Sequence, residues 1–414
     1  MENLENIWLY LDPYVFISED SEWYLFYNTH IKKGIVFERN KVINKVVSYL
    51  QQTDNMYSIL ITMKELEDNR LYEFVQSLQE AGFGNIIEGK LPKPIVMQPF
   101  LNLQKSVERM KKNNIPVSEN IMSYLHDVTI YLNGTCVHDC KECRNMFKQW
   151  TCCTKSKNTL DFKQLKNFLQ SIAYACPTIN ITGGNPFQYP ELFELFEVLG
   201  RNESMQTFIV NYLNLPEDLD LLYIFTNKSF QLKIIVCDSY QIDSLIATAD
   251  KLKKGNINQL WEIGITSIGE FEKAEQLSEQ LAEYDIRTTV KPYFDGENLE
   301  FFEDNIFVAQ EDILAVEFDR QGVFALQALN TNDFGKITVL SDGKIYANIN
   351  REPIGKIEEP IGGILCKELE AGISWRNTRY QVEPCSRCCF RLICPSPSNY
   401  EIAIGRSNLC HVKN

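Results

Sequence analysis

Three closely spaced cysteines constrain this chain more than any other feature. Cys136, Cys140 and Cys143 are separated by three and then two residues, and they follow the extended-looking run 127–132. A loop this short can present three thiolates to one corner of a cubane iron–sulfur cluster, which leaves the fourth iron without a protein ligand. A cofactor can occupy that open iron. The spacing therefore predicts a strand that ends at a cluster-binding loop.

The composition favours metal or redox chemistry in a cytosolic protein. The 414-residue chain has 13 cysteines, none before Cys136, and its first residues lack the basic opening of a signal peptide. In a cytosolic chain, cysteines indicate metal or redox chemistry rather than disulfides. The net charge of −14 argues against a general nucleic-acid binder. No run approaches the roughly 18 apolar residues of a membrane span, so we expect no membrane association.

From residue 126 the pattern alternates between short apolar runs and amphipathic segments. We expect six strands, at 128–132, 179–182, 207–210, 232–236, 260–265 and 287–290. We expect the helices between them at 160–173, 192–199, 242–252 and 271–284. This alternation predicts a parallel sheet, and right-handed crossovers place its helices on one side. The carboxyl ends of the strands, where the cysteine loop lies, are then the expected site of chemistry.

A pair of glycines follows the second predicted strand, in the segment 182–186 (Thr-Gly-Gly-Asn-Pro). On their own, paired glycines indicate only a turn at which the backbone can approach another group closely. Together with the cysteine loop, they resemble the radical S-adenosylmethionine (SAM) superfamily, which carries a Gly-Gly-Glu-Pro-like motif at this point. The resemblance implies a partial (β/α)6 barrel over residues 126–297. It also implies that Cys136, Cys140 and Cys143 bind a [4Fe–4S] cluster whose open iron takes SAM.

The same resemblance assigns SAM contacts to the glycine motif and to the ends of later strands. These residues are Gly183, Gly184, Asn185, Pro186, Asn211, Asp238 and Thr266. Two positions depart from the family pattern. Asn185 stands where the family has an acid, and Glu142 stands where it has an aromatic residue. An amide oxygen still accepts a hydrogen bond from an ammonium group, but without the assistance of a charge.

A second group of cysteines lies near the C-terminus, after a predicted hairpin at 337–346. Its members are Cys385, Cys388, Cys394 and Cys410. The Cx2Cx5C spacing with a distant fourth cysteine resembles the SPASM extension of radical SAM peptide maturases. The resemblance implies one auxiliary [4Fe–4S] cluster on these four residues, because the cysteines of a second site are missing from 346–350 and 395–398. Taken alone, four cysteines also suit a tetrahedral zinc site.

Residues 1–94 indicate a separate N-terminal domain in which strands are followed by helices. We expect strands at 7–11, 14–17, 23–27 and 58–61, and helices at 42–50 and 71–78. The layout resembles a winged-helix-like module, similar to the PqqD-like element that recognises a leader peptide by adding it to a sheet edge. A domain that only stabilises the chain is the alternative. Residues 95–125 form the expected linker, with a basic helix at 103–112, and 298–414 the SPASM-like domain.

Together these resemblances imply a radical SAM peptide maturase. Such an enzyme cleaves SAM to a 5′-deoxyadenosyl radical, which abstracts hydrogen from a ribosomally made precursor peptide. An auxiliary cluster favours an oxidative cross-link, either thioether or carbon–carbon, over epimerisation. We expect a flavodoxin- or ferredoxin-type electron donor. Two other classes stay open: a catalytically inactive radical-SAM-like partner, which Asn185 and Glu142 favour, and a zinc-dependent regulatory protein.

Overall fold

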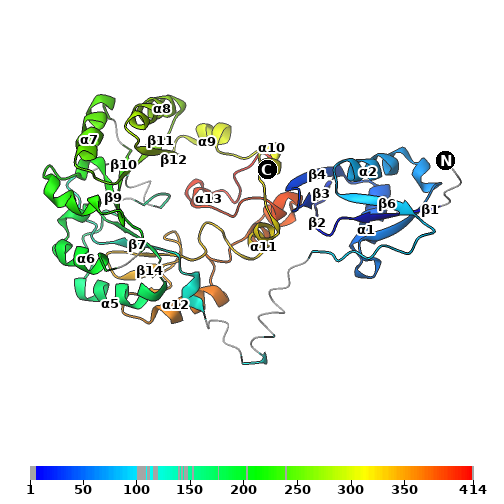
Figure 1. Ribbon diagram of the computed structural model, residues 1–414, viewed down its shortest axis with the longest axis horizontal. Coiled ribbons are helices and arrows are strands. Elements are labelled where there is room, and N and C mark those ends of the chain that lie inside the picture. Colours follow the sequence, from blue (N-terminus) through cyan, green and yellow to red (C-terminus); the bar gives the residue numbers. More distant parts are fainter. Residues whose placement is uncertain are drawn as a thin grey trace.

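The computed structural model describes residues 6–99, 109, 112–114, 120–138, 140, 143, 148–151, 153–175, 177–201, 204–237 and 240–412. They form a mixed α/β structure with one sheet of nine strands and two sheets of three strands. The large sheet lies at one end of the molecule and the small sheets at the other (Figure 1). Within these residues, every helix is too short or too polar to cross a membrane.

The large sheet contains all six strands predicted between residues 126 and 297. They are β7 (Asp127–Tyr131), β8 (Thr178–Thr182), β9 (Gln206–Asn211), β10 (Phe230–Val236), β11 (Gln259–Ile265) and β12 (Arg287–Pro292). Each pairs in parallel with the next along the chain, so their order in space follows the sequence. The prediction of a parallel sheet is confirmed.

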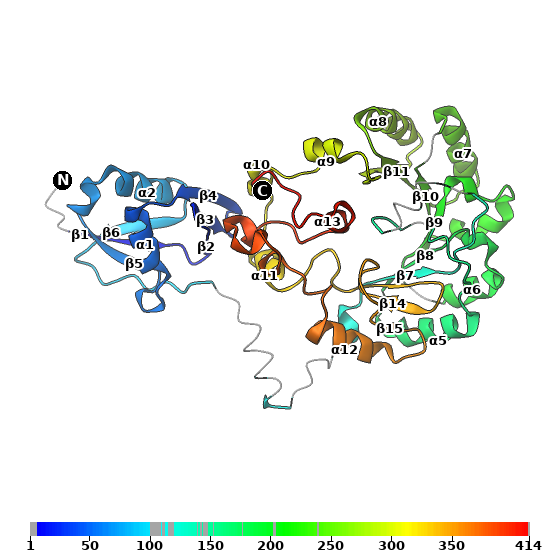
Figure 2. The same cartoon turned by 180° about the vertical axis from the view of Figure 1, so that it is seen from behind.

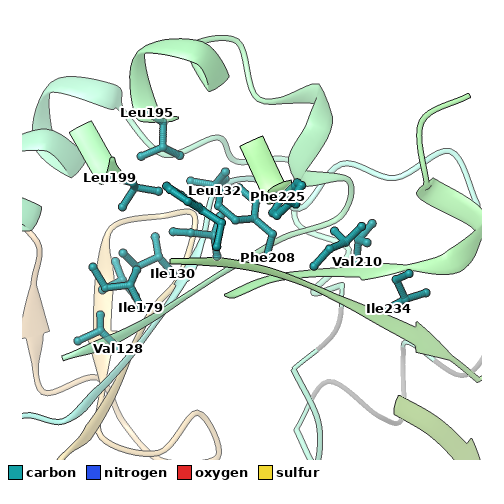
Figure 3. Close-up of a cluster of buried hydrophobic side chains, with 14 of the residues drawn as sticks. Val128, Ile130, Leu132, Ile179, Leu195, Leu199, Phe208, Val210, Phe225 and Ile234 are labelled. Carbon is teal, nitrogen blue, oxygen red and sulfur yellow. The ribbon is translucent and has the colours of Figure 1, made fainter. Parts of the chain in front are cut away.

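The four predicted helices are also present, and they cover one face of this sheet (Figure 1). They are α5 (Phe162–Ile172), α6 (Leu192–Leu199), α7 (Ile242–Lys254) and α8 (Ile268–Glu283). Alternate residues of the strands, such as Val128, Ile130 and Phe208, point toward the helices and meet Leu195 and Leu199 of α6 (Figure 3). Burial of each such side chain stabilises the fold by about 1.5–3 kcal/mol. This core orients the carboxyl ends of the strands.

The predicted hairpin is confirmed, and it extends the large sheet. β13 (Lys336–Val339) and β14 (Lys344–Tyr346) are antiparallel, and Gly343 occupies the turn with φ +78°. β13 also pairs in parallel with β7, and β14 pairs with the short β15 (Gly355–Lys356). The remaining helices are α9 (Leu299–Asn305), α10 (Gln310–Ala315), α11 (Arg320–Ala328), α12 (Ile361–Ala371) and α13 (Asn399–Ile404).

The N-terminal part contains two antiparallel sheets and two helices with a core of their own. One sheet is β5 (Ser58–Thr62), β1 (Asn6–Leu11) and β6 (Gly84–Glu88); the other is β2 (Val15–Glu19), β3 (Trp23–Asn28) and β4 (Lys33–Glu38). The helices are α1 (Lys41–Gln51) and α2 (Asn69–Glu80). The predicted strands and helices are all present. The sequence analysis did not predict β4 and β6.

The sheet β2–β3–β4 packs against the C-terminal part of the chain, an arrangement visible from both sides (Figures 1 and 2). Phe16, Leu25 and Tyr27 share a buried cluster with Val323 and Phe390. The Tyr27 hydroxyl accepts a hydrogen bond from the backbone N–H of Phe318 at 2.7 Å. The boundary near residue 94 and the winged-helix arrangement stay predictions, and most of the predicted helix at 103–112 lies outside the described residues.

Candidate functional site

A pocket of about 380 Å³ opens at the carboxyl ends of β7, β8 and β9. Six of the residues predicted to bind cluster or SAM line it: Cys136, Cys140, Cys143, Gly183, Gly184 and Asn211. The pocket thus brings together three segments that are far apart in the sequence. This agrees with the expectation that carboxyl ends of parallel strands meet at one edge.

The glycine pair is held tightly against the chain that leads into the cysteine loop. The backbone N–H of Gly184 donates to both the carbonyl and the side-chain oxygen of Asn133, each at 3.0 Å. A Cβ atom on Gly184 would lie 2.0 Å from the Thr135 carbonyl oxygen, so no other residue fits there. Gly183 adopts φ +158°, at the edge of the region that favours glycine. The turn therefore exposes backbone, not side chain, to the pocket.

Asn214 links the glycine turn to the first cysteine, and the sequence analysis missed it. Its Nδ2 lies 3.0 Å from the Gly184 carbonyl oxygen and 3.4 Å from Cys136 Sγ. Only 6% of Asn214 is exposed. It follows β9 by three residues and belongs to no sequence pattern, so nothing in the sequence distinguishes it. Asn211, which was predicted, accepts a hydrogen bond from the Leu213 N–H at 2.9 Å and so shapes the same turn.

The cysteines of this pocket are partly or fully shielded from solvent. Cys143 is 4% exposed, and Cys136 and Cys140 are half-buried. Cys153 also lines the pocket, where its thiol lies 3.6 Å from the Gly134 carbonyl oxygen. Burial raises the pKa of Cys153 to about 11, opposed by the N–H of Lys155 and assisted by the nearby Cys143. Cys153 is therefore a neutral thiol at physiological pH.

Three of the predicted residues are described but do not line this pocket. The side-chain oxygen of Asn185 accepts a hydrogen bond from the Phe187 N–H at 3.0 Å and caps the 3-10 turn that begins at Pro186. Thr266 donates its hydroxyl hydrogen to Glu270 at 2.8 Å, at the start of α8. Asp238 lies outside the described residues. The roles of these residues toward SAM stay predictions.

The C-terminal cysteines gather around a buried arginine. Burial raises the pKa of Cys394 to about 12; Arg379 opposes this, and the sulfurs of Cys385, Cys410 and Cys388 add to it. Arg379 forms an ion pair with Glu401 at 2.6 Å, with both side chains buried. The structure thus brings the four predicted cysteines together, and Arg379, which the sequence analysis missed, lies among them.

Neither cysteine group surrounds a position for a single metal ion. Among the residues that the structure describes, no three His, Cys, Asp or Glu side chains converge closely enough to bind one ion. A zinc ion needs all four ligands at bonding distance from one point. In a cubane cluster each thiolate binds a different iron atom, so the four sulfurs surround a larger volume than the ligands of one zinc ion. The auxiliary cluster and the zinc site therefore both stay predictions for Cys385, Cys388, Cys394 and Cys410.

A polar network joins the two segments that lack the cysteines of a second auxiliary site. Asn348 Nδ2 donates to both oxygens of Asp333, at 3.1 and 3.0 Å, and to Asn399 Oδ1 at 2.7 Å. Asn330 donates to the Pro397 carbonyl oxygen at 3.0 Å. Burial raises the pKa of Asp333 to about 6, against the opposing effects of Asn348 and neighbouring cations. Amides and a carboxylate hold together the loops at 346–350 and 395–398.

The sequence matches no protein-family model and no curated protein. Its structure resembles SuiB of Streptococcus suis bound to the precursor peptide SuiA, with a TM-score of 0.53 and 14% identity over 97% of this chain and 98% of SuiB. SuiB bound to S-adenosylmethionine matches over the same shares with a TM-score of 0.50 and 14% identity. The anSMEcpe protein with AdoMet and the Cp18Cys peptide has a TM-score of 0.46, 14% identity, and coverage of 64% and 87%. The chain therefore shares the fold of SuiB along almost its entire length.

Proposed function

We propose that this protein is a radical SAM enzyme that modifies a ribosomally made precursor peptide. The observation that carries the proposal is the pocket in which the Cx3Cx2C loop and the glycine turn meet at the carboxyl ends of a parallel sheet. The shared fold with SuiB, a protein crystallised with SAM and with a precursor peptide, supports it. By this proposal the six parallel strands form a partial barrel.

Cys136, Cys140 and Cys143 would hold a [4Fe–4S] cluster. Gly183 and Gly184 pack closely against residues 133–135 and line the pocket with backbone alone. When bound, the cluster and SAM supply a 5′-deoxyadenosyl radical that can remove hydrogen from carbon. The chain's own part is to orient the ligands, exclude water and hold Cys153 as a neutral thiol next to the pocket. We further assign Asn185, Pro186, Asn211, Asp238 and Thr266 to SAM contacts.

Cys385, Cys388, Cys394 and Cys410 would hold one auxiliary [4Fe–4S] cluster. The positive charge of Arg379 beside these sulfurs favours their thiolate form and opposes part of the effect of burial. Segments 346–350 and 395–398 contain no cysteine, which supports a single auxiliary cluster. Asn348, Asp333 and Asn399 form a polar network in this region. An electron acceptor close to the substrate favours an oxidative cross-link. Epimerisation is the alternative, and it predicts a product with the same mass as the precursor.

The N-terminal part would bind the leader of the precursor peptide along a sheet edge, as the winged-helix-like resemblance implies. Tethering the leader raises the effective concentration of the segment to be modified. A flavodoxin- or ferredoxin-type protein would supply the electron in the cytosol.

The decisive experiment measures 5′-deoxyadenosine released from SAM by the reduced, iron-reconstituted protein. The C136A/C140A/C143A variant should release none and should lose about four of about eight irons, as two cubanes require. Cys366→Ala, which changes a cysteine on α12 outside both groups, is the matched control and should keep activity and iron. No product from the intact protein at full iron content would contradict the proposal.

One observation favours a second candidate, a catalytically inactive partner that binds precursor peptide. The side chain of Asn185 caps a 3-10 turn instead of facing the pocket. An inactive partner would bind the peptide and fail to cleave SAM in the same experiment.

A further inference from the structure

The inner face of the large sheet carries polar side chains where a packed barrel has branched apolar ones. Successive residues of a strand point to opposite faces. Thr129, Asn180, Lys233, Glu262 and Lys291 therefore point away from the apolar core under the helices. In the sequence this pattern is visible as single polar residues inside apolar runs.

Four of these side chains, all except Glu262, line a cavity of about 1,080 Å³ that is open to solvent, which we call the lumen. Thr151 and Ile209 line both the lumen and the cysteine pocket. The two spaces are therefore adjacent, with no strand between them. A group bound in the lumen lies next to whatever occupies the cysteine pocket.

Positive charge exceeds negative charge in the lumen, although the chain as a whole carries −14. Four lysines line it: Lys148, Lys233, Lys291 and Lys336. Lys233 and Lys291 share one carboxylate, Glu262, at 2.5 and 3.0 Å. Lys336 forms no ion pair with any residue that the structure describes. Asp127 and Asp333 are carboxylates that line the lumen, and Glu262 pairs with two of its lysines, so the described residues supply four cations and three anions.

The two aspartates are already engaged by amides. Asn180 Nδ2 lies 3.1 Å from both oxygens of Asp127, and Asn348 donates to both oxygens of Asp333. Burial raises the pKa of both carboxyl groups, and the charge of Lys336 opposes that rise at each of them. The ammonium groups of Lys291 and Lys336 line the lumen and are partly exposed to solvent, so an added carboxylate can reach them.

We propose that the lumen binds a carboxylate of the substrate peptide, either an acidic side chain or a free C-terminus, next to the cysteine pocket. The inference rests on the proposed function, because only that function places a peptide at this end of the sheet. An ammonium and a carboxylate form a charge-assisted hydrogen bond, stronger than its neutral counterpart. A site that pairs a charge discriminates against a ligand that lacks it, because that ligand forms only the weaker neutral hydrogen bond.

The test uses the iron-reconstituted protein with SAM and three synthetic peptides. Two are acetylated and amidated, Ala-Ala-Glu-Ala-Ala and Ala-Ala-Gln-Ala-Ala; the third is acetylated penta-alanine with a free C-terminus. Binding is measured by ligand-observed NMR. The glutamate peptide or the free C-terminus should bind about tenfold more tightly than the glutamine peptide, the effect of one charged hydrogen bond. Which of the two binds identifies the source of the carboxylate.

Lys336→Gln and, independently, Lys291→Gln should reduce this preference to about twofold or less. Lys367→Gln changes an exposed lysine on α12 outside the lumen and should leave the preference intact. Equal binding of all three peptides, or an unchanged preference in both lumen variants, overturns the inference. Release of 5′-deoxyadenosine is measured alongside. If 5′-deoxyadenosine is released but the protein shows no preference for a carboxylate peptide, the lumen site alone is rejected. If the preference is present but no 5′-deoxyadenosine is released, the enzymatic function alone is rejected.

Discussion

At the scale of single residues, Asn214 joins two parts of the candidate site that the sequence analysis treated separately. One amide reaches the Gly184 carbonyl and the Cys136 sulfur from a buried position. Among the described residues, Asn214 is the side chain that contacts both the Gly184 carbonyl and the Cys136 sulfur. The orientation of the cysteine loop against the glycine turn therefore depends on this side chain.

We predict that Asn214→Ala destabilises the metal-free protein by about 1–3 kcal/mol, because it leaves a buried carbonyl without its donor. It should also weaken SAM binding to the reconstituted protein. Urea unfolding and equilibrium dialysis measure the two effects. Asn305→Ala, which removes an exposed amide that bonds only to the Phe301 carbonyl of its own helix, is the control and should have little effect. Equal losses from both substitutions would contradict the assigned role.

Asp333 gives a prediction about pH. Its pKa of about 6 in the folded protein exceeds its ordinary value of 3.8, so the folded state binds the proton more tightly than the unfolded state. Its contribution to the free energy of unfolding is present below pH 4 and is lost as the pH rises to about 6. A shift of about two units corresponds to about 3 kcal/mol at most. Asp333→Asn should flatten the pH dependence of stability between pH 4 and 6, measured by urea unfolding; an unchanged slope contradicts this assignment.

At the scale of elements, helix α6 shows how one apolar face holds the sheet in place. Leu195 is fully buried between the helix and the strands (Figure 3). Phe193 on the same helix is 65% exposed. Thus, of two apolar residues only two positions apart, one is buried and the other is exposed to solvent. The helical period decides which of them belongs to the core.

We predict that Leu195→Ala lowers the free energy of unfolding by about 2–5 kcal/mol, because it removes buried methyl groups and leaves a cavity. Phe193→Ala removes a larger but exposed side chain and should change stability by less than about 0.5 kcal/mol. Thermal or urea unfolding of the two variants makes the comparison. A greater loss from Phe193→Ala would show that the exposed face of α6 is covered by something else.

At the scale of the whole molecule, the N-terminal sheet is tied to the turn that carries two C-terminal cysteines. The backbone N–H of Cys389 donates to Asp20 at 3.3 Å, and Arg391 donates to the Glu19 carbonyl at 3.3 Å. Tyr27 reaches the Phe318 backbone from the same sheet. Contacts between residues more than 280 positions apart thus hold the C-terminal cysteine group against β2 and β3.

We predict that Tyr27→Phe destabilises the protein by about 1–2 kcal/mol, because the Phe318 N–H loses its buried acceptor. Limited proteolysis should then cleave faster between residues 316 and 320. Tyr72→Phe, at a tyrosine that is 55% exposed on α2, is the matched control and should behave like the original protein. Unchanged stability of Tyr27→Phe would show that apolar packing alone holds the two parts together.

Local patterns determined what the sequence could predict. The six parallel strands and four helices of the large sheet follow from apolar periodicity, which is written in consecutive residues. The cysteine loop follows from a spacing of a few residues. The glycine turn lies beside the cysteine loop because it directly follows β8, so its position in the sheet fixes its position in the pocket.

Tertiary structure decided which side chains face each other, since that depends on pairs far apart in the sequence. Asn214 meets Cys136 across 78 positions, and Arg379 meets the cysteine group only after the loops around it have folded. Asn185 follows the second predicted strand, and its side-chain oxygen accepts a hydrogen bond from the nearby Phe187 N–H. The lysines of the lumen come together only when β10, β12 and β13 align their inner faces. Periodicity fixes which face a residue joins, and the packing of strands against one another fixes what it meets there.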